Sequence, residues 1–209
     1  ALEKRKIIHE IGLNDEKPIV LVFGGSQGAQ SINRSMTELI VNKKNKGYQI
    51  IWAAGPEQYD KIKQKLSEVH VNLDKIEDVK IVPYIYNMEE VMNVADLLVC
   101  RSGAMTITEV AMLGKPAIFI PFPYATENHQ EYNARVLEKV GAAKIILDKD
   151  LNSEILSQML KEIIKDNKKM KEMGEAALKI AMPNVLDKIY EEIKSVKLEI
   201  NFIKIGILL

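Results

Sequence analysis

The 209-residue sequence lacks the features that mark several specialised classes of protein. It has one cysteine, Cys100, which excludes an internal disulfide and is typical of a reducing compartment such as the cytoplasm. Its three histidines are scattered, and no Cys/His ligand spacing predicts a metal site. No Ser-His-Asp or Cys-His nucleophile arrangement is visible either. These absences argue against a metalloenzyme and against covalent catalysis.

An excess of charge and a long apolar run are also missing. Lys and Arg together number 29, as do Asp and Glu, so the net charge is zero, which disfavours nucleic acid as a partner. No signal peptide is present, nor a run of the ~20 apolar residues that span a bilayer. The composition, 47% hydrophobic and 28% charged, is that of a soluble globular domain. The chain opens on Ala1 and passes directly into a charged helical segment, so we expect a piece of a longer protein.

Short apolar runs alternate with helical patterns along the chain. Strands are expected at residues 19–23, 48–53, 79–82, 97–100, 117–120 and 143–147. Helices are expected at residues 2–11, from the glycine turn to about 42, 56–69, 88–95, 104–113, about 127–140, 152–166, 168–181 and 184–196. The alternation predicts an α/β fold, a doubly wound six-stranded parallel sheet that is Rossmann-like, with right-handed crossovers.

A glycine-rich turn with Gly24, Gly25 and Gly28 follows the first strand. Its spacing matches neither the Walker loop nor the dinucleotide fingerprint. Its glycines still allow the backbone to approach a phosphate, the next helix offers free N–H groups, and Ser26 adds a hydroxyl donor. A tight strand-to-helix turn without a ligand explains the same residues equally well.

A second turn follows the strand at residues 97–100, with the next helix directly after it. The turn is Arg101, Ser102 and Gly103, and the helix begins with Ala104, Met105 and Thr106. Two helix N-termini at one edge of the sheet, each carrying roughly half a positive charge, would hold a diphosphate without a metal. Glu109 shares a helix face with Met105 and Thr106, opposite the core-facing Ile107, Val110 and Ala111, and is placed to accept hydrogen bonds from ribose hydroxyls. A solvated surface glutamate is the simpler alternative.

A third group of polar residues opens the helix expected near residue 127. His129, Gln130 and Asn133 share a face at helical spacing, and amides both donate and accept, which suits sugar hydroxyls. Capping by Asn128 with a solvated first turn is the simpler explanation. No general base stands out, so the chain looks more like a holder of substrate than a complete catalytic machine.

Together, residues 24–30, residues 100–106, Glu109 and residues 130–134 resemble the carboxy-terminal domain of the MurG family, in glycosyltransferase family 28. The resemblance covers about residues 18–196. It implies one half of a two-domain GT-B transferase that uses no metal or other cofactor and makes lipid II from lipid I in peptidoglycan synthesis. The carboxy-terminal domain of such an enzyme binds UDP-N-acetylglucosamine, and the amino-terminal domain holds the lipid at the cytoplasmic face of the membrane.

The resemblance also implies roles for individual residues. Ser26 matches a donor-loop serine, the backbone of Ile85 matches the group that recognises uracil, and Glu109 matches the ribose carboxylate. Gln130 and Asn133 match groups that read the sugar, and His129 stands where some members have glutamine. The full expected set of substrate contacts is Ser26, Asn33, Ile85, Arg101, Ser102, Gly103, Ala104, Met105, Thr106, Glu109, His129, Gln130 and Asn133, with Gly24, Gly25 and Gly28 as the phosphate loop.

The sequence departs from the family at both ends. The acceptor domain, with its glycine-rich loop and histidine, and the arginine of the interdomain linker are absent, so we expect no catalytic residue here and an inactive fragment. We divide the chain into a linker helix segment (1–17), the donor-binding domain (18–196) and an apolar tail (197–209). Four explanations of the tail are open: an added edge strand, pairing of two chains, contact with a membrane surface, or disorder. We prefer packing of the tail on the domain or pairing of two chains.

Two other functions stay open at this point. One is a non-catalytic donor-binding subunit of a split N-acetylglucosaminyltransferase, working with a separate membrane-anchored chain. The other is a different UDP-sugar enzyme of GT-B fold, such as a 2-epimerase or a glycolipid synthase. The spacing of Gln130 and Asn133 argues against the second of these.

Overall fold

The computed structural model describes residues 2–181 and 190–195. The strands are β1 Ile19–Phe23, β2 Gln49–Ala53, β3 Val79–Val82, β4 Leu97–Cys100, β5 Ala117–Phe119 and β6 Ala143–Ile145. The helices are α1 Leu2–Glu10, α2 Gln30–Val41, α3 Pro56–Glu68, α4 Met88–Val94, α5 Ala104–Leu113, α6 His129–Lys139, α7 Ser153–Ile164 and α8 Asn167–Ile180. Short 3₁₀ turns stand at η1 Leu73–Lys75, η2 Thr126–Asn128 and η3 Asp148–Asp150.

The six strands form one parallel sheet in the order β3-β2-β1-β4-β5-β6, which confirms the doubly wound fold expected from the sequence. At its centre Val22 of β1 pairs with Trp52 of β2 on one side and with Val99 of β4 on the other. The strand order reverses between β1 and β4. The loops that leave these two strands therefore diverge, and this is the point where open α/β sheets bind ligands.

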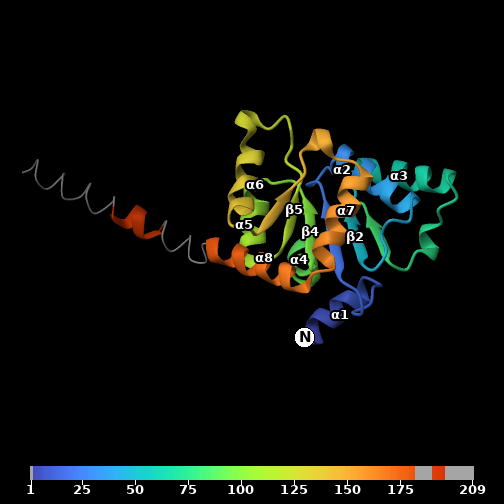
Figure 1. The fold of residues 1–209 in the computed structure, drawn as a ribbon, viewed down its shortest axis with the longest axis horizontal. Helices are drawn as coiled ribbons and strands as arrows, with labels where there is room; N and C mark the ends of the chain where they lie inside the picture. Colours follow the sequence, from blue (N-terminus) through green and yellow to red (C-terminus); the bar gives the residue numbers. More distant parts are fainter. Residues whose placement is uncertain (1, 182–189, 196–209) are drawn as a thin grey trace, which may run out of the picture.

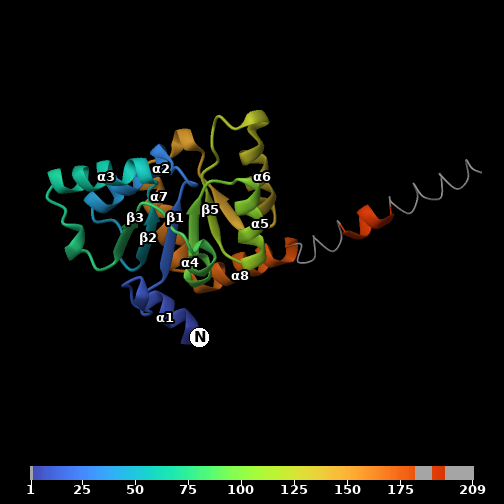
Figure 2. The same ribbon diagram turned by 180° about the vertical axis from the view of Figure 1, so that it is seen from behind.

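Helices cover both faces of the sheet (Figures 1 and 2). On one face, the side chains of Val20 and Val22 pack with α2, α3 and α7. On the other, Leu21 and Phe23 pack with α1, α4, α5 and α6, and α8 contributes to both cores. Every residue of β1 is buried, so alternate residues face two apolar layers. This is why the strand shows no polar alternation in the sequence.

Several expected boundaries shift by a few residues. The helix expected from residue 127 begins at His129, because Glu127 and Asn128 adopt left-handed φ angles of 52° and 54° that interrupt the helix. The strands expected at 48–53, 117–120 and 143–147 are one or two residues shorter. Residues 190–195 are helical. The other residues of the helix expected at 184–196, namely 184–189 and 196, lie outside the described residues. The apolar tail (197–209) lies outside them as well.

Within the described part of the chain, no helix has both the length and the apolar character needed to cross a bilayer.

Candidate functional site

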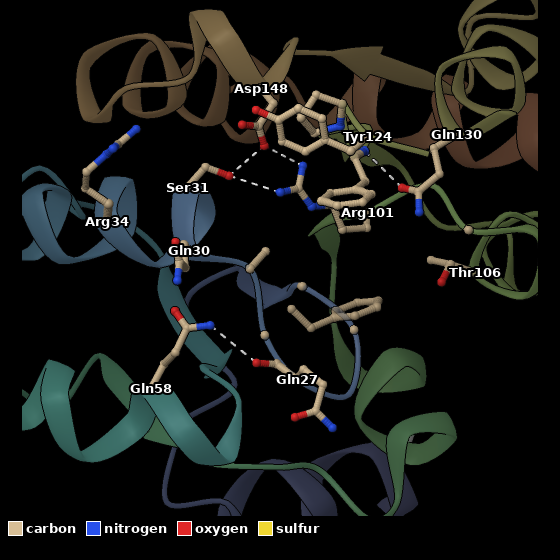
Figure 3. Close-up of a pocket in the computed structure, with 18 of the residues that line it drawn as sticks. Gln27, Gln30, Ser31, Arg34, Gln58, Arg101, Thr106, Tyr124, Gln130 and Asp148 are labelled. Atoms are coloured by element: carbon tan, nitrogen blue, oxygen red, sulfur yellow. Dashed lines mark hydrogen bonds and ion pairs between the residues drawn. The ribbon is translucent and has the colours of Figure 1, made fainter. Parts of the chain in front are cut away.

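A pocket of about 730 Å³ opens at the carboxyl edge of the sheet, between the loops that follow β1 and β4 (Figure 3). This volume is in the range of small-molecule binding sites. The pocket brings together both turns singled out in the sequence and one residue of α6. The expected site residues that line it are Gly24, Gly25, Gly28, Arg101, Gly103, Thr106 and Gln130.

The turn before α2 is held by close backbone packing. Gly28 has a φ of +76°, and a Cβ placed there would lie 2.0 Å from the carbonyl oxygen of Ala54. The turn therefore rests directly on the β2–α3 connection. Gly25 has a φ of +94°, but nothing lies within 4 Å of its Cβ position. Packing alone thus requires glycine at position 28, whereas at position 25 only the backbone angle favours it.

The start of α2 lies at the pocket and has no side-chain cap. Ala29 occupies the N-cap position and has no side-chain acceptor to offer. Gln30 and Ser31, the first residues of the helix, both line the pocket. Helix N-termini present N–H groups and a partial positive charge, so this end of α2 favours an anionic ligand.

The start of α5 is built by residues of α6. Gly103 is its N-cap residue, again without a side-chain acceptor. The hydroxyl of the fully buried Ser102 donates to the main-chain oxygen of Gln130 at 2.7 Å. The Gln130 side-chain oxygen accepts from the N–H groups of Ser102 (3.3 Å) and Phe122 (3.0 Å), and the Asn133 amide donates to the Ser102 oxygen at 3.1 Å. Gln130 and Asn133, expected to read a sugar, therefore also fix the turn that precedes α5.

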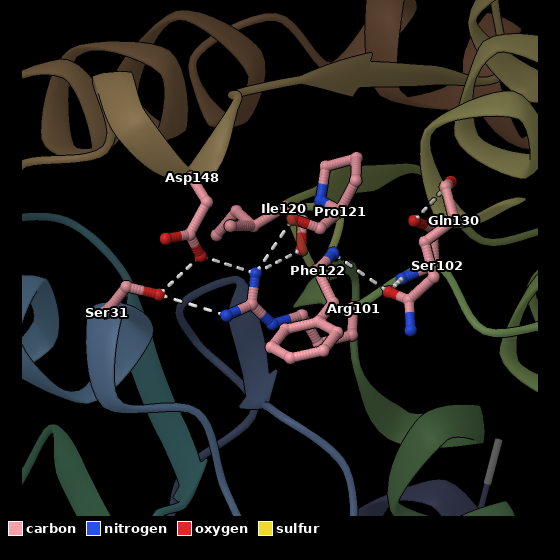
Figure 4. A network of polar contacts seen from close by, with 8 residues as sticks. All are labelled: Ser31, Arg101, Ser102, Ile120, Pro121, Phe122, Gln130 and Asp148. Carbon is pink, nitrogen blue, oxygen red and sulfur yellow. Dashed lines mark hydrogen bonds and ion pairs between the residues drawn. The ribbon is translucent and has the colours of Figure 1, made fainter. Parts of the chain in front are cut away.

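A polar network not foreseen from the sequence closes one wall of the pocket (Figure 4). The guanidinium of Arg101 donates to the carboxylate of Asp148 at 2.6 Å and to the hydroxyl of Ser31 at 3.0 Å. Ser31 donates in turn to the same Asp148 oxygen at 2.6 Å. Arg101 also donates to the carbonyl oxygens of Ile120 and Pro121, both at 2.9 Å. One side chain thus joins α2, the end of β5 and η3.

This network changes the interpretation of Arg101. The sequence predicted Arg101 as a substrate contact, and that role stays a prediction; in the structure its guanidinium is paired with the carboxylate of Asp148. Local sequence carried no signal for Asp148, which follows β6 and lies 47 residues further along the chain. The exposed rings of Phe122 and Tyr124, edge to face at 5.7 Å on the pocket rim, were not foreseen either.

Asn33 does not fit its expected role as a substrate contact. It is buried, with an exposed fraction of 4%, and does not line the pocket. Its amide group donates to the Ala54 oxygen at 2.7 Å and to the Gln58 side chain at 2.8 Å, and its oxygen accepts from the Trp52 indole at 2.9 Å. Both amide hydrogens are therefore used to fasten α2 to the β2–α3 connection and to α3, and the oxygen fastens it to β2. We correct the prediction accordingly, since a buried indole donor needs such an acceptor.

Other expected contacts lie at the same edge of the sheet but outside the pocket lining. Ser26 is exposed at the tip of its turn, and Met105 and Glu109 are exposed on α5, whose Val110 and Ala111 face the core as expected. Ile107, expected to face the core with them, is half-buried and packs against that core. Ala104 is exposed at the first position of α5. The roles assigned to these residues stay predictions.

Ile85 and His129 do not line the pocket either. Ile85, in the β3–α4 loop, is buried and borders a separate hollow of about 470 Å³ beside β3. His129 is exposed, and its Nδ1 lies 2.9 Å from the Thr126 oxygen, which can only accept. Nδ1 therefore carries the proton and Nε2 is left free to face solvent or a ligand.

No group of three or more His, Cys, Asp or Glu side chains suited to a metal ion occurs among the described residues.

The sheet is parallel and doubly wound, and the pocket lies where the strand order reverses, between two helix N-termini. These features define a class of α/β domains that bind nucleotide-derived ligands. Residues 19–189 match the glycosyltransferase family 28 C-terminal domain, and the chain belongs to this family. The resemblance stated from the sequence motifs is thereby confirmed.

Named relatives agree with this assignment. The chain is 43% identical over 188 residues to the UDP-N-acetylglucosamine–N-acetylmuramyl-(pentapeptide) pyrophosphoryl-undecaprenol N-acetylglucosamine transferase of Acetivibrio thermocellus, covering 90% of this chain and 50% of that protein. It is 43% identical to the transferase of the same name from Lactobacillus helveticus, covering 91% and 52%. The chain thus spans about half the length of the curated relatives it matches.

One solved structure agrees with the family assignment, and a second agrees with the fold alone. The crystal structure of Acinetobacter baumannii MurG matches with a TM-score of 0.75 and 30% identity, over 87% of this chain and 53% of that one. A UDP-GlcNAc 2-epimerase from Neisseria meningitidis matches with a TM-score of 0.62 at 13% identity, over 93% of this chain and 48% of that one. The second likeness shows a shared fold only.

Proposed function

We propose that this chain is the donor-binding half of a transferase that moves N-acetylglucosamine from UDP to lipid I and so forms lipid II. The observation that carries the proposal is the pocket at the switch point, bordered by two helix starts without side-chain caps, in a chain of family 28. The named transferases among its relatives, at about 40% identity, favour this reaction over that of the epimerases, which share only the fold.

In this proposal the donor diphosphate lies between the starts of α2 and α5. The N–H groups there, with the hydroxyl of Thr106 at the pocket wall, stabilise the negative charge that develops on UDP as the glycosidic bond breaks. Ser26 adds a hydroxyl from the loop tip. Glu109, one turn into α5, accepts hydrogen bonds from the ribose hydroxyls, and the backbone at Ile85 pairs with uracil.

The sugar would be read from α6. The Gln130 side-chain oxygen is fixed by two backbone donors, which aims its amide hydrogens away from the turn. Asn133 and the free Nε2 of His129 complete this group. The acceptor, the C4 hydroxyl of the muramoyl sugar, attacks the anomeric carbon from the face opposite the leaving UDP, so the configuration at that carbon inverts.

Deprotonation of the acceptor belongs to a second domain in this proposal. That domain would also hold lipid I at the cytoplasmic face of the membrane. The chain itself binds the donor, orients it and stabilises the leaving group. It would bind UDP-N-acetylglucosamine and, alone, transfer nothing.

Titration calorimetry with UDP, UDP-N-acetylglucosamine and UDP-glucose tests the proposal. We expect UDP-N-acetylglucosamine to bind more tightly than UDP-glucose, and Glu109→Ala to weaken UDP binding about tenfold, as the loss of charge-assisted hydrogen bonds does. Glu175→Ala, which removes an exposed glutamate of α8, is the matched control and should leave binding unchanged. Equal affinity in Glu109→Ala and wild type would remove the ribose assignment, and no UDP binding at millimolar concentration would remove the donor site.

A further inference from the structure

The pair of Arg101 and Asp148 is more shielded than the other ion pairs of the described residues. The exposed fractions of the two side chains are 12% and 19%, and the Phe122 ring lies 5.5 Å from the guanidinium. Pairs in such surroundings interact more strongly than pairs in open solvent. Because Ser31 donates to the same carboxylate oxygen, the geometry of the pair is fixed from two sides.

The pair lies within the wall of the proposed donor pocket. Four charged side chains border that pocket: Arg34, Glu57, Arg101 and Asp148. Two are basic and two acidic, so the side chains add no net charge, although a nucleoside diphosphate is strongly anionic. The carboxylate of Asp148 neutralises the part-buried guanidinium of Arg101, and its negative charge would repel a diphosphate that enters the pocket.

We infer that Asp148 limits the affinity of this pocket for the nucleoside diphosphate by occupying Arg101. The inference rests on the proposed function. Asp148 is a positioning residue: it acts through the guanidinium and leaves the attraction of the diphosphate to the backbone N–H groups of α2 and α5. The consequence for turnover is faster release of the diphosphate product, a step that limits the rate of many enzymes.

Asp148→Asn separates charge from geometry. An asparagine oxygen can still accept from both Arg101 and Ser31, but the negative charge is gone. We expect UDP to bind roughly three- to tenfold more tightly, the size of effect that one charge has at a part-buried site. We also expect the affinity to fall more steeply with added salt than in wild type, because an uncompensated guanidinium then faces the diphosphate.

Two variants serve as controls. Asp150→Asn removes the same charge from the same 3₁₀ turn, but Asp150 is exposed and does not line the pocket. It should change the UDP dissociation constant less than twofold. Ser31→Ala loosens the network while keeping both charges, so it should not tighten binding. If Asp148→Asn does not fold, Asp148→Ser removes the same charge and should change affinity in the same direction.

The outcomes separate this inference from the function it rests on. If wild type binds UDP and a folded Asp148→Asn variant binds it equally or more weakly, the inference is overturned and the proposed function stands. If Asp150→Asn or Ser31→Ala tightens UDP binding as much as Asp148→Asn does, the inference is also overturned. The tighter binding would then come from a remote change of charge or from loosening of the network. If neither wild type nor Asp148→Asn binds UDP at millimolar concentration, the donor site and this inference fall together.

Discussion

The helices of this domain begin in two different ways. At the start of α7, Asn152 accepts hydrogen bonds from the backbone N–H groups of Glu154 (3.0 Å) and Ile155 (2.9 Å). At the start of α8, Asp166 accepts from the N–H of Lys169 at 2.9 Å. The two helices that border the pocket begin instead at Ala29 and Gly103, which supply no side-chain acceptor.

The difference separates helices that only support the fold, α7 and α8, from helices that border the candidate site, α2 and α5. α7 and α8 satisfy part of their free N–H groups internally, while α2 and α5 leave theirs for a ligand or solvent. A missing cap is not sufficient, because α3, α4 and α6 also lack a side-chain cap. What distinguishes α2 and α5 is their place: they follow β1 and β4, between which the strand order reverses.

The largest expected effect comes from breaking the backbone packing that places α2. Gly28→Ala combines a φ of +76° with a Cβ 2.0 Å from the Ala54 oxygen, so the turn must move. We expect a loss of about 3 kcal/mol in the free energy of unfolding, measured by urea denaturation. Gly25→Ala is the control, since its Cβ meets open space, and should cost only ~1 kcal/mol from the backbone angle. Equal losses would mean that the contact with Ala54 is not what holds the turn.

The next test gives α5 the cap that α8 has. Gly103 has a φ of −63° and no atom within 4 Å of its Cβ position, so a side chain fits there without strain. Gly103→Asp should stabilise the fold by a few tenths of a kcal/mol, as N-cap residues do relative to glycine. It should weaken UDP binding at least about tenfold, because a carboxylate then occupies the N–H groups and repels the diphosphate.

Gly103→Asn separates the two causes. It offers the same cap without the charge, so we expect a smaller loss of UDP affinity in calorimetry. If neither variant weakens binding, the start of α5 does not hold the diphosphate.

The fold, and the meeting of the two turns at one edge of the sheet, followed from the sequence for a clear physical reason. An apolar run such as residues 19–23 is buried on both faces, and such strands belong to parallel sheets. Parallel strands end at one edge, so the turns at Gly24 and Arg101 had to meet there. The left-handed residues Glu127 and Asn128, which delay the start of α6, leave no comparable pattern in the sequence.

The network inside the site was not predictable in the same way. Asp148 reaches Arg101 only because β4, β5 and β6 are neighbours in the sheet, and the polar residues around Asp148 suggest nothing beyond a surface turn. Asn33 misled in the opposite direction. The family resemblance implied a ligand contact for it, but the indole of Trp52 donates a hydrogen bond to its side-chain oxygen. Partners distant in sequence decided both cases.

The smallest expected effect comes from removing a cap on the scaffold side. Asn152→Ala deletes the acceptor for two N–H groups at the start of α7 and should lower the free energy of unfolding by about 1 kcal/mol in urea denaturation. Because Asn152 does not line the pocket, UDP affinity should stay within twofold of wild type. Asn152→Asp keeps an acceptor and should restore most of the stability. Asn152→Ala could instead lower UDP affinity, with Asn152→Asp failing to restore it. The start of α7 would then belong to the ligand site, which would contradict the distinction between capped helices and helices that border the pocket.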